Sequence, residues 1–385
     1  MHETCALCTT QVTIPATTYC EMPVKIAVTL PGAGCTPVGG YKVIYEYANG
    51  LARRGHEVIV IHPARLKKNE RMLRISLKAI RYLQRRLDGS FRPDSWFRID
   101  QRVTLLWVPS LHQRHIPNAD VVIATAWQTA EWVHSYGPEK GVKYYLIHDY
   151  EHYMTADSGT RARIAATYSG NIHNIVTSPA GVEMLKACGA EVDAYIPNGI
   201  DFAMFKLKTD FGSAERRAIG FPSRPEKFKG TRDAVAALGN VRKKLGDNIA
   251  AWSFGGRKPN YLPSWIKYYE RPSDELLCDL YNSSAIFVTA SHYEGWGLPG
   301  AEAMACGAAL VSTEHGGVRA YAEHGRTALL SAPKDIDALA ENVCRLLENS
   351  DLRQNIAQAG YQHIQHFTWD KAVDALEAAL SHGGK

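Results

Sequence analysis

Two glutamates in one glycine-rich stretch are the side chains best suited to chemistry. The segment EGWGLPGAEAMACG runs from Glu294 to Gly307, directly after a short apolar strand at 286–289. Pro299 suits the first turn of a helix, and Gly307 suits its end. Gly295 and Gly297 let a ligand approach the backbone closely. The amides that follow, together with the positive end of the helix, predict an anion site that would fit a diphosphate.

The two carboxylates of this stretch can serve one ligand in different ways. We place Glu294 in the loop and Glu302 in the first helical turn, so that both can face the same molecule. Glu294 would lie near the reactive end of the ligand, and Glu302 would accept hydrogen bonds from its hydroxyl groups. The alternative is that Glu302 only stabilises the helix N-terminus, where acidic residues are favourable.

A basic segment, SRPEKFKG, precedes another predicted helix and carries Arg224, Lys227 and Lys229. Taken alone, the segment is more typical of a solvated loop.

The loop GAGCTPVGG, from Gly32 to Gly40, follows the first predicted strand but does not match a dinucleotide-binding fingerprint. The third glycine position is Pro37, and the second strand ends at His62 without the acid that would bind a ribose. This argues against NAD binding. Gly39 and Gly40, at the start of a predicted helix, fit a plain tight turn.

His148 ends the predicted strand at 144–147 and is followed by Asp149, which places an imidazole at the ligand edge of the first sheet. A single histidine in a chain with 15 of them is more often structural. Trp127, after the strand at 121–125, is a weaker candidate for stacking on a sugar or an acceptor.

Two possible metal motifs are both explained without a metal. Asp335 and Asp337 form a DxD triplet, but they fall where a helix begins, which is the expected place for acidic caps. Cys5 and Cys8 form a lone CxxC to which Cys20 and His2 could add ligands. We expect no metal site, and we interpret residues 1–22 as an N-terminal extension.

A basic amphipathic helix is predicted at 65–87. The stretch from Arg65 to Arg86 holds nine lysines or arginines against the single acid Glu70, with apolar residues at helical spacing. Such a helix could bind an anionic membrane surface, since each exposed basic residue contributes about 1 kcal/mol there. It could equally pack its leucines on the first domain. Nucleic acid is the least favoured partner.

The elements that must position these residues alternate between strands and helices, which predicts an α/β protein with two doubly wound parallel sheets. We divide the chain into domains at 23–200 and 201–366, with a final helix at 367–385 that could return to the first domain. Ligands of such sheets bind beyond the carboxyl ends of the strands, so a cleft between two facing domains is expected. The expected strands are 24–30, 57–61, 103–108, 121–125, 144–148, 174–177 and 194–196 in the first domain, and 217–220, 250–254, 286–289, 309–312 and 328–330 in the second.

Composition agrees with an ordinary globular protein. The chain has 385 residues, 45% hydrophobic and 22% charged, with a formal charge of +5 that is too small to argue for nucleic-acid binding. No stretch approaches the roughly 20 apolar residues of a membrane-spanning helix. The eight scattered cysteines are typical of reduced cytosolic thiols.

The spacing of Glu294 and Glu302 resembles the E-x7-E signature of family 4 glycosyltransferases, which are retaining enzymes of the GT-B fold. Other segments resemble this family in the same order along the chain, and the resemblance spans about Val24 to Leu380, more strongly in the second half. These segments are PNGID at 197–201, LYNSSAIFVTAS at 280–291, HGGVRAYAEHGRTALL at 315–330 and FTWD at 367–370.

The resemblance implies roles for single residues. Arg224 and Lys229 would clamp the donor diphosphate, and Glu302 would bind the ribose. Glu294 would position the transferred sugar, with His148 beside it. The remaining implied positions are Gly295, Gly297 and Leu298 on the donor, Gly39 and Gly40 facing its phosphates across the cleft, and, more weakly, Trp127 and Asp149 toward the acceptor.

The implied activity is transfer of a sugar, without a metal or cofactor, from a nucleotide sugar to a hydroxyl of a glycan or lipid-linked acceptor. The chain resembles enzymes of bacterial polysaccharide assembly. We therefore expect it in the cytoplasm or on the inner face of the membrane. A nucleotide-sugar epimerase of the same fold and a non-catalytic sugar-binding protein are the alternatives. Two departures from the family pattern, Arg319-Ala320 and the segment 265–271, leave the far side of the donor pocket and the base open.

Overall fold

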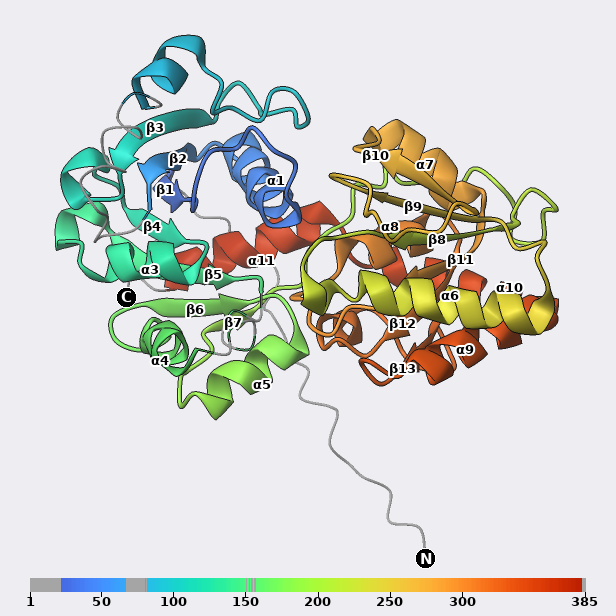
Figure 1. The fold of residues 1–385 in the computed structure, drawn as a ribbon. Helices are drawn as coiled ribbons and strands as arrows, with labels where there is room; N and C mark the ends of the chain where they lie inside the picture. The colour runs from blue at the N-terminus through green and yellow to red at the C-terminus, as the bar shows by residue number, and fades with distance from the viewer. Residues whose placement is uncertain are drawn as a thin grey trace, which may run out of the picture.

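The computed structural model describes residues 22–66, 80, 82–149, 151, 153, 155 and 157–382. Two parallel sheets, each flanked by helices, form two lobes that lie side by side (Figure 1). The predicted α/β architecture with two Rossmann-like domains is confirmed. The residues 1–21 and most of the predicted basic helix lie outside the described part of the chain.

The first sheet has seven strands in the order β3-β2-β1-β4-β5-β6-β7. Its order reverses between β1 and β4, so the carboxyl ends of these two strands flank a crevice of the kind in which open α/β sheets bind ligands. Its elements are β1 Lys25–Thr29, α1 Gly39–Arg53, β2 Glu57–Arg65, β3 Thr104–Ser110, β4 Val121–Ala124, α3 Trp127–His134, β5 Val142–Ile147, α4 Ser158–Ala166, β6 His173–Val176, α5 Pro179–Ala187 and β7 Ala194–Tyr195.

The second sheet has six strands in the order β10-β9-β8-β11-β12-β13. It repeats the reversal of the first sheet, here between β8 and β11. Its elements, with the last helix of the chain, are β8 Ala218–Pro222, α6 Thr231–Leu245, β9 Ala251–Gly255, β10 Ile266–Glu270, α7 Asp274–Asn282, β11 Ser284–Thr289, α8 Leu298–Ala305, β12 Ala309–Thr313, β13 Ala328–Ser331, α9 Ile336–Glu348, α10 Ser350–Ile364 and α11 Trp369–His382.

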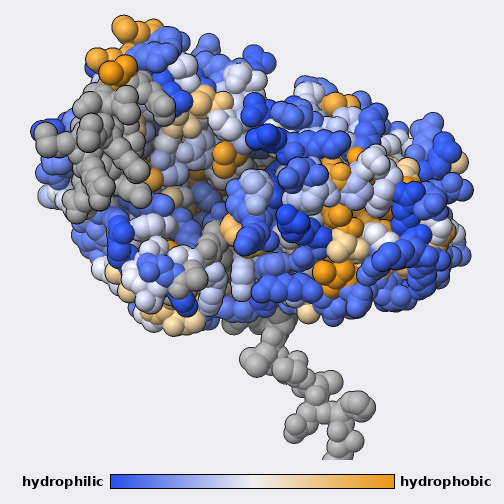
Figure 2. All heavy atoms as spheres, viewed as in Figure 1, coloured by the Kyte–Doolittle hydropathy of each residue, from blue (hydrophilic) through white to orange (hydrophobic). Residues whose placement is uncertain are grey.

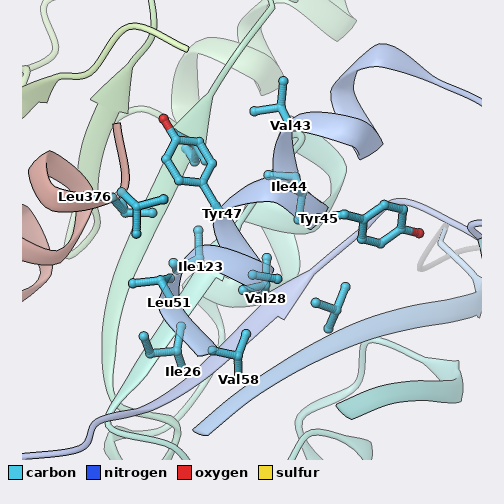
Figure 3. Close-up of a cluster of buried hydrophobic side chains, with 14 of the residues drawn as sticks. Ile26, Val28, Val43, Ile44, Tyr45, Tyr47, Leu51, Val58, Ile123 and Leu376 are labelled. Carbon is cyan, nitrogen blue, oxygen red and sulfur yellow. The ribbon is translucent and has the colours of Figure 1, made fainter. Parts of the chain in front are cut away.

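Alternating side chains along each strand divide both domains into layers. In β1, Ile26 and Val28 join the core shared with α1 and α11, whereas Ala27 joins the core on the opposite face. Figure 3 shows the first of these cores, where α1 side chains meet the strands and Leu376 of α11. Because a strand buried on both faces must be apolar throughout, these segments read as continuous hydrophobic runs in the sequence.

The last helix, α11, packs on the first domain although it follows the second in sequence. Trp369, Val373 and Leu376 lie in the core of the first domain, and Tyr144 of β5 donates a hydrogen bond to the Leu380 carbonyl at 3.1 Å. The chain therefore crosses between the domains twice. The two crossings run side by side, since the Ile200 amide donates to the Phe367 carbonyl at 2.9 Å.

Gly199, at the first crossing, is required by this close approach. A Cβ at Gly199 would lie 2.3 Å from the Trp369 amide nitrogen and 2.6 Å from the Thr368 carbonyl carbon. We expect Gly199→Ala to lower the free energy of unfolding by about 1–3 kcal/mol, because backbone must shift to relieve the overlap. Gly239→Ala is the matched control: it lies within α6 with nothing within 4 Å, and should stabilise by about 0.5–1 kcal/mol. Urea unfolding measures both, and equal effects would contradict the assignment of the crossing.

Several element boundaries differ from the sequence prediction. The strand expected at 217–220 lies at Ala218–Pro222, and β10 was not predicted as a strand. β2 continues through Pro63 to Arg65; beyond Ile61 it pairs with β3 alone, so the missing amide of the proline is tolerated. The single helix expected over 335–363 is two helices, because Asn349 caps α10 by accepting from the Leu352 amide at 2.9 Å.

Candidate active site

The loop between β11 and α8 holds Glu294 against the glycine pair at 316–317. The Glu294 amide donates to the His315 carbonyl at 3.3 Å, and the Gly317 amide donates to the Glu294 carbonyl at 3.1 Å. A Cβ at Gly317 would lie 2.5 Å from that carbonyl oxygen, so only glycine allows the two segments to run this close. These hydrogen bonds hold the backbone of Glu294 in place.

The carboxylate of Glu294 pairs with Lys229, a contact that the sequence analysis did not predict. Lys229 Nζ donates to Glu294 Oε2 at 2.7 Å, and Ser291 donates to Oε1 at 3.0 Å. Burial would raise the pKa of Glu294, but Lys229 and its hydrogen bond, with His315 and Ser291, hold this pKa below its ordinary value. The pKa of Lys229 is raised although burial opposes this, because Glu294 and Asp149 lie close. Both groups therefore carry full charge at neutral pH.

The first domain meets this pair directly. A Cβ at Gly295 would overlap the His148 carbonyl oxygen and would lie 3.0 Å from Asp149 Cα, so the two loops are in backbone contact across the domains. Burial raises the pKa of Asp149 to about 6, and Glu294 adds to the shift, while Lys229 and the Gly295 amide oppose it. The structure thus gathers His148, Asp149, Lys229, Glu294 and Gly295 at one place.

The glycine pair Gly39-Gly40 lies beside His148 and, across the domains, beside Leu298. Both residues open helix α1, and Cβ atoms built on them would lie 3.9 Å from Leu298 Cδ1 and 3.1 Å from His148 Nε2. Leu298 is the first residue of α8, whose N-cap is Gly297 at φ 95° with no side-chain cap. The positive end of α8 therefore lies next to Gly39 of the first domain.

Glu302 is buried and lies in the second turn of α8, not the first. The helix begins at Leu298, so the fifth residue has passed one turn of 3.6 residues. Its carboxylate accepts from Tyr281 at 3.3 Å and from Lys42 of the first domain at 3.4 Å. The alternative role as decoration of an exposed helix end is therefore wrong, since only 5% of Glu302 is exposed.

Arg224 does not touch Lys229 or Glu294 in the described contacts. Its guanidinium donates to the carbonyls of Ser223 at 3.0 Å and Phe254 at 3.3 Å, and lies over the Phe254 ring at 5.2 Å. It is nevertheless close enough to Tyr281, the partner of Glu302, to influence its ionisation. Arg224 lies on the Glu302 side of the site, and Lys229 lies on the Glu294 side.

The weaker acceptor candidates are separated. Asp149 belongs to the cluster around Lys229, whereas Trp127 opens α3 and its ring is covered by Arg163 at 4.9 Å. The Trp127 amide donates to Glu151 at 2.9 Å. The described contacts of Trp127 therefore do not include any donor-side residue.

Three further site residues were missed from the sequence. Lys42 and Tyr281 contact Glu302, and His315 lies 3.3 Å from the Cβ position of Gly297 with its buried Nε2 unpaired among the described residues. Lys42 follows Gly40 by two residues, and that proximity was the available signal. Tyr281 and His315 stand inside segments that resemble the family as a whole, which gave no reason to select them individually.

The DxD acids Asp335 and Asp337 form structural contacts. Asp335 caps α9 by accepting from the Ala338 amide at 2.9 Å, and Asp337 accepts from Asn240 at 3.2 Å. Within residues 22–66 and 80–382, apart from the undescribed positions, no group of three metal-binding side chains is found. Cys5 and Cys8 lie outside the described residues.

His148 is held neutral by its surroundings. Burial lowers its pKa to about 4, and Nδ1 has no partner among the described residues. An unfolded histidine titrates near 6.5, so between pH 6.5 and 4 the unfolded chain binds a proton that the folded chain does not. The contribution of His148 therefore lowers the free energy of unfolding as the pH falls from 6.5 to 4.

We expect the stability difference between the wild type and His148→Gln to change with pH. Because the variant lacks the titrating ring, the free energy of unfolding of the wild type relative to the variant should fall by about 1–2 kcal/mol between pH 7 and pH 5. Denaturant unfolding at both pH values measures it. A difference that stays constant would show that the ring is hydrated in the folded chain.

Comparisons with known proteins point to glycosyltransferases. Residues 213–363 match the family described as glycosyl transferases group 1. A glycogen synthase of Mycobacterium tuberculosis is 27% identical over 303 residues, which cover 75% of this chain and 68% of that protein. O-antigen chain mannosyltransferase B of Escherichia coli is 33% identical over 110 residues, 28% of each chain.

Solved structures of the GT-B fold superpose on both domains. Sucrose-phosphate synthase from Thermosynechococcus elongatus gives a TM-score of 0.70 at 15% identity, covering 94% of this chain and 99% of its own. HepE from Anabaena, solved in complex with UDP-glucose, gives a TM-score of 0.70 at 18% identity. The match covers 93% of this chain and 100% of that protein. These likenesses establish the fold, and the sequence matches connect the chain to group 1 glycosyltransferases.

Proposed function

We propose that this homologue of the group 1 glycosyltransferases moves a sugar from a nucleotide-sugar donor to an acceptor hydroxyl, with retention of anomeric configuration and without a metal ion. The observation that carries the proposal is the cluster of Lys229 and Glu294 with His148 and Asp149, formed across two domains at the N-terminus of α8. Fixed cations and a helix end stabilise a departing diphosphate best where they are already in place.

The donor would lie along α8, mainly on the second domain. Lys229 and Arg224 would bind the diphosphate, and the backbone from Gly295 to Leu298 would support the phosphates or the sugar. Glu302 would accept hydrogen bonds from the ribose. A carboxylate has about four acceptor positions, and the described contacts of Glu302 use two of them, so two hydroxyls can still be accommodated.

The transferred sugar would lie between Glu294 and His148. His148 ends β5 on the first domain, and its Nε2 lies 3.1 Å from the Cβ position of Gly40, so the imidazole borders the glycine turn. Its low pKa, about 4, keeps the ring neutral, which leaves it able to donate or accept a hydrogen bond without adding charge. Front-face attack, in which the leaving phosphate accepts the acceptor proton, requires no protein nucleophile. Positioning and electrostatics would then carry the rate.

Named relatives support the choice of substrates. The Anabaena protein was solved with UDP-glucose, which supports a nucleotide-sugar donor, and the Escherichia coli relative is named an O-antigen chain mannosyltransferase. A Myxococcus xanthus relative is named O-antigen biosynthesis protein RfbC and is 22% identical over 283 residues. We therefore favour a glycan or lipid-linked acceptor in polysaccharide assembly.

Attachment to an anionic membrane surface is a further part of the proposal. Ile80, Leu83 and Leu87 are 64%, 57% and 89% exposed, and hydrophobic atoms gather at the top of the first domain in Figure 2, where Figure 1 draws this segment. Arg85 and Arg86 lie in the same segment. Among the described helices, none is long and apolar enough to cross a membrane.

A panel of nucleotide sugars, incubated with the protein in EDTA, tests the proposed activity. A transferase releases nucleoside diphosphate slowly even without acceptor, an epimerase returns a new nucleotide sugar, and a sugar-binding protein produces neither. NMR of the glycoside formed with an acceptor reports its anomeric configuration. Activity that is lost in EDTA and restored by manganese would contradict the metal-free mechanism.

A further inference from the structure

Lys42 links the first domain to the buried carboxylate of the second. It lies in the first turns of α1, two residues after Gly40, and its Nζ lies 3.4 Å from Glu302 Oε1 and 3.1 Å from Asp274 Oδ2. Asp274 opens α7, and Glu302 lies on α8. The lysine of the first domain therefore contacts two helices of the second domain.

The environment of Lys42 is that of a built contact. Its side chain is 17% exposed, and Nζ lies 4.8 Å above the ring of the buried Phe205. Burial would lower the pKa of Lys42, but Glu302, Asp274 and Glu46 raise it above the ordinary value, so the ammonium keeps its charge. If this ammonium moved away, the carboxylates of Glu302 and Asp274 would lose the positive charge that both of them contact.

The ionisation of Glu302 depends on the positive charge of Lys42. Burial raises its pKa, and Asp274 on α7 raises it further, whereas Lys42 is the largest opposing influence and Tyr281 on α7 adds a hydrogen bond. Cys306, at the end of α8, and Tyr321 also lie within its electrostatic reach. Among the described neighbours of Glu302, Lys42 is the cation in contact with its carboxylate. A protonated Glu302 would accept hydroxyl hydrogen bonds poorly, since an ionised acceptor forms the stronger bond.

We propose that Lys42 is a positioning residue for the donor, supplied by the first domain to keep Glu302 ionised and oriented toward the ribose of a nucleoside diphosphate. This inference rests on the proposed donor site and adds a residue to it. Because Lys42 and Glu302 belong to different domains, the ribose contact is complete only when the domains are together. Donor binding and domain closure are thus coupled through one ion pair.

Binding of nucleoside diphosphates tests the inference. Titration calorimetry with UDP, GDP and ADP first identifies the diphosphate that the wild type binds. Lys42→Met should then weaken that affinity about 10- to 100-fold, the effect of losing a hydrogen bond to a charged group, and Lys42→Arg should restore most of it. Lys42→Met should also weaken discrimination against the 2′-deoxy and 3′-deoxy forms.

The pH profile of binding separates positioning from loss of domain contact. In Lys42→Met the acid-side loss of affinity should move to higher pH than in the wild type, because the pKa of Glu302 rises further. Asp274→Asn also removes an α1–α7 contact, but it takes away a neighbouring negative charge, so its acid-side loss should move to lower pH. If Lys42 served only to hold the domains together, both variants would shift in the same direction.

The outcomes distinguish this inference from the proposed function. If the wild type binds none of the three diphosphates, the donor site itself is wrong. If the wild type binds one of them and Lys42→Met matches it in affinity, deoxy discrimination and pH profile, the donor site stands and the role of Lys42 is overturned. Thermal unfolding of each variant confirms that the fold is retained.

Discussion

Lys229→Ala should lower kcat/KM for donor turnover about 100- to 1,000-fold, the usual effect of removing a fixed group that stabilises developing negative charge. Lys229 is the cation in direct contact with Glu294, at 2.7 Å, and it also influences Asp149. Its loss leaves two carboxylates facing a negatively charged leaving group. The defect should appear mainly in kcat, because the charge on the diphosphate grows as the glycosidic bond breaks. Steady-state release of nucleoside diphosphate measures it.

Lys227→Ala is the matched control for this substitution. Lys227 belongs to the same short 3-10 helix, Lys227–Lys229, but its side chain is exposed. It should turn over at the wild-type rate, and a comparable loss in both variants would indicate a general effect of the basic loop. Because removing Lys229 leaves buried charge unpaired, thermal unfolding must show that the variant remains folded at the assay temperature.

Glu294→Gln should reduce kcat about 100-fold or more while preserving the shape of the side chain. The amide can still bond to Ser291, but it has no charge to offset Lys229 or the positive charge that develops on the transferred sugar. The ground-state contacts change less than the transition-state ones, so KM should change less than kcat. Rates of sugar transfer and of donor hydrolysis in the same preparation give both constants.

Glu341→Gln controls for the loss of one glutamate from an ion pair elsewhere in the second domain. Glu341 pairs with Lys244 at 3.1 Å, and both side chains are about half exposed. Exposed pairs contribute little, so turnover should not change. Were Glu294→Gln to keep the wild-type kcat, the assignment of the sugar position between Glu294 and His148 would be wrong.

The architecture was predictable because it depends on residue patterns repeated along the chain. Buried parallel strands need apolar residues on both faces, as in Ile286, Phe287 and Val288, of which the middle one faces the opposite core. Edge strands carry a weaker signal. β10, with Lys267 and Glu270 exposed, pairs only with β9 and was not recognised as a strand.

The candidate site was predictable only in part. The glycine, proline and glutamate pattern of Glu294 to Gly307 indicates a loop and a helix end, and that is what the structure shows. Lys42 could not be assigned in this way, because its contact with Glu302 joins residues 260 positions apart. Local sequence patterns specify elements, whereas such cross-domain pairs depend on how the two lobes pack together.

The departure at Arg319 has a structural explanation. At this position, where the family resemblance implies an acid, Arg319 forms two hydrogen bonds of 3.0 Å to Glu183 on α5 of the first domain and lies 3.5 Å from Glu314. The residue thus joins the two domains. At this position the chain has a domain contact in place of an acidic group.

The central claim is that protein cations and the positive end of α8 hold the leaving diphosphate. Titration calorimetry in EDTA, with the selected nucleoside diphosphate and its monophosphate, tests it most directly in the wild type and Lys229→Ala. We predict that Lys229→Ala weakens the affinity for the diphosphate about 10- to 100-fold and the affinity for the monophosphate much less. Equal affinities of both proteins for the diphosphate, or binding that appears only when a divalent metal is added, would contradict the account.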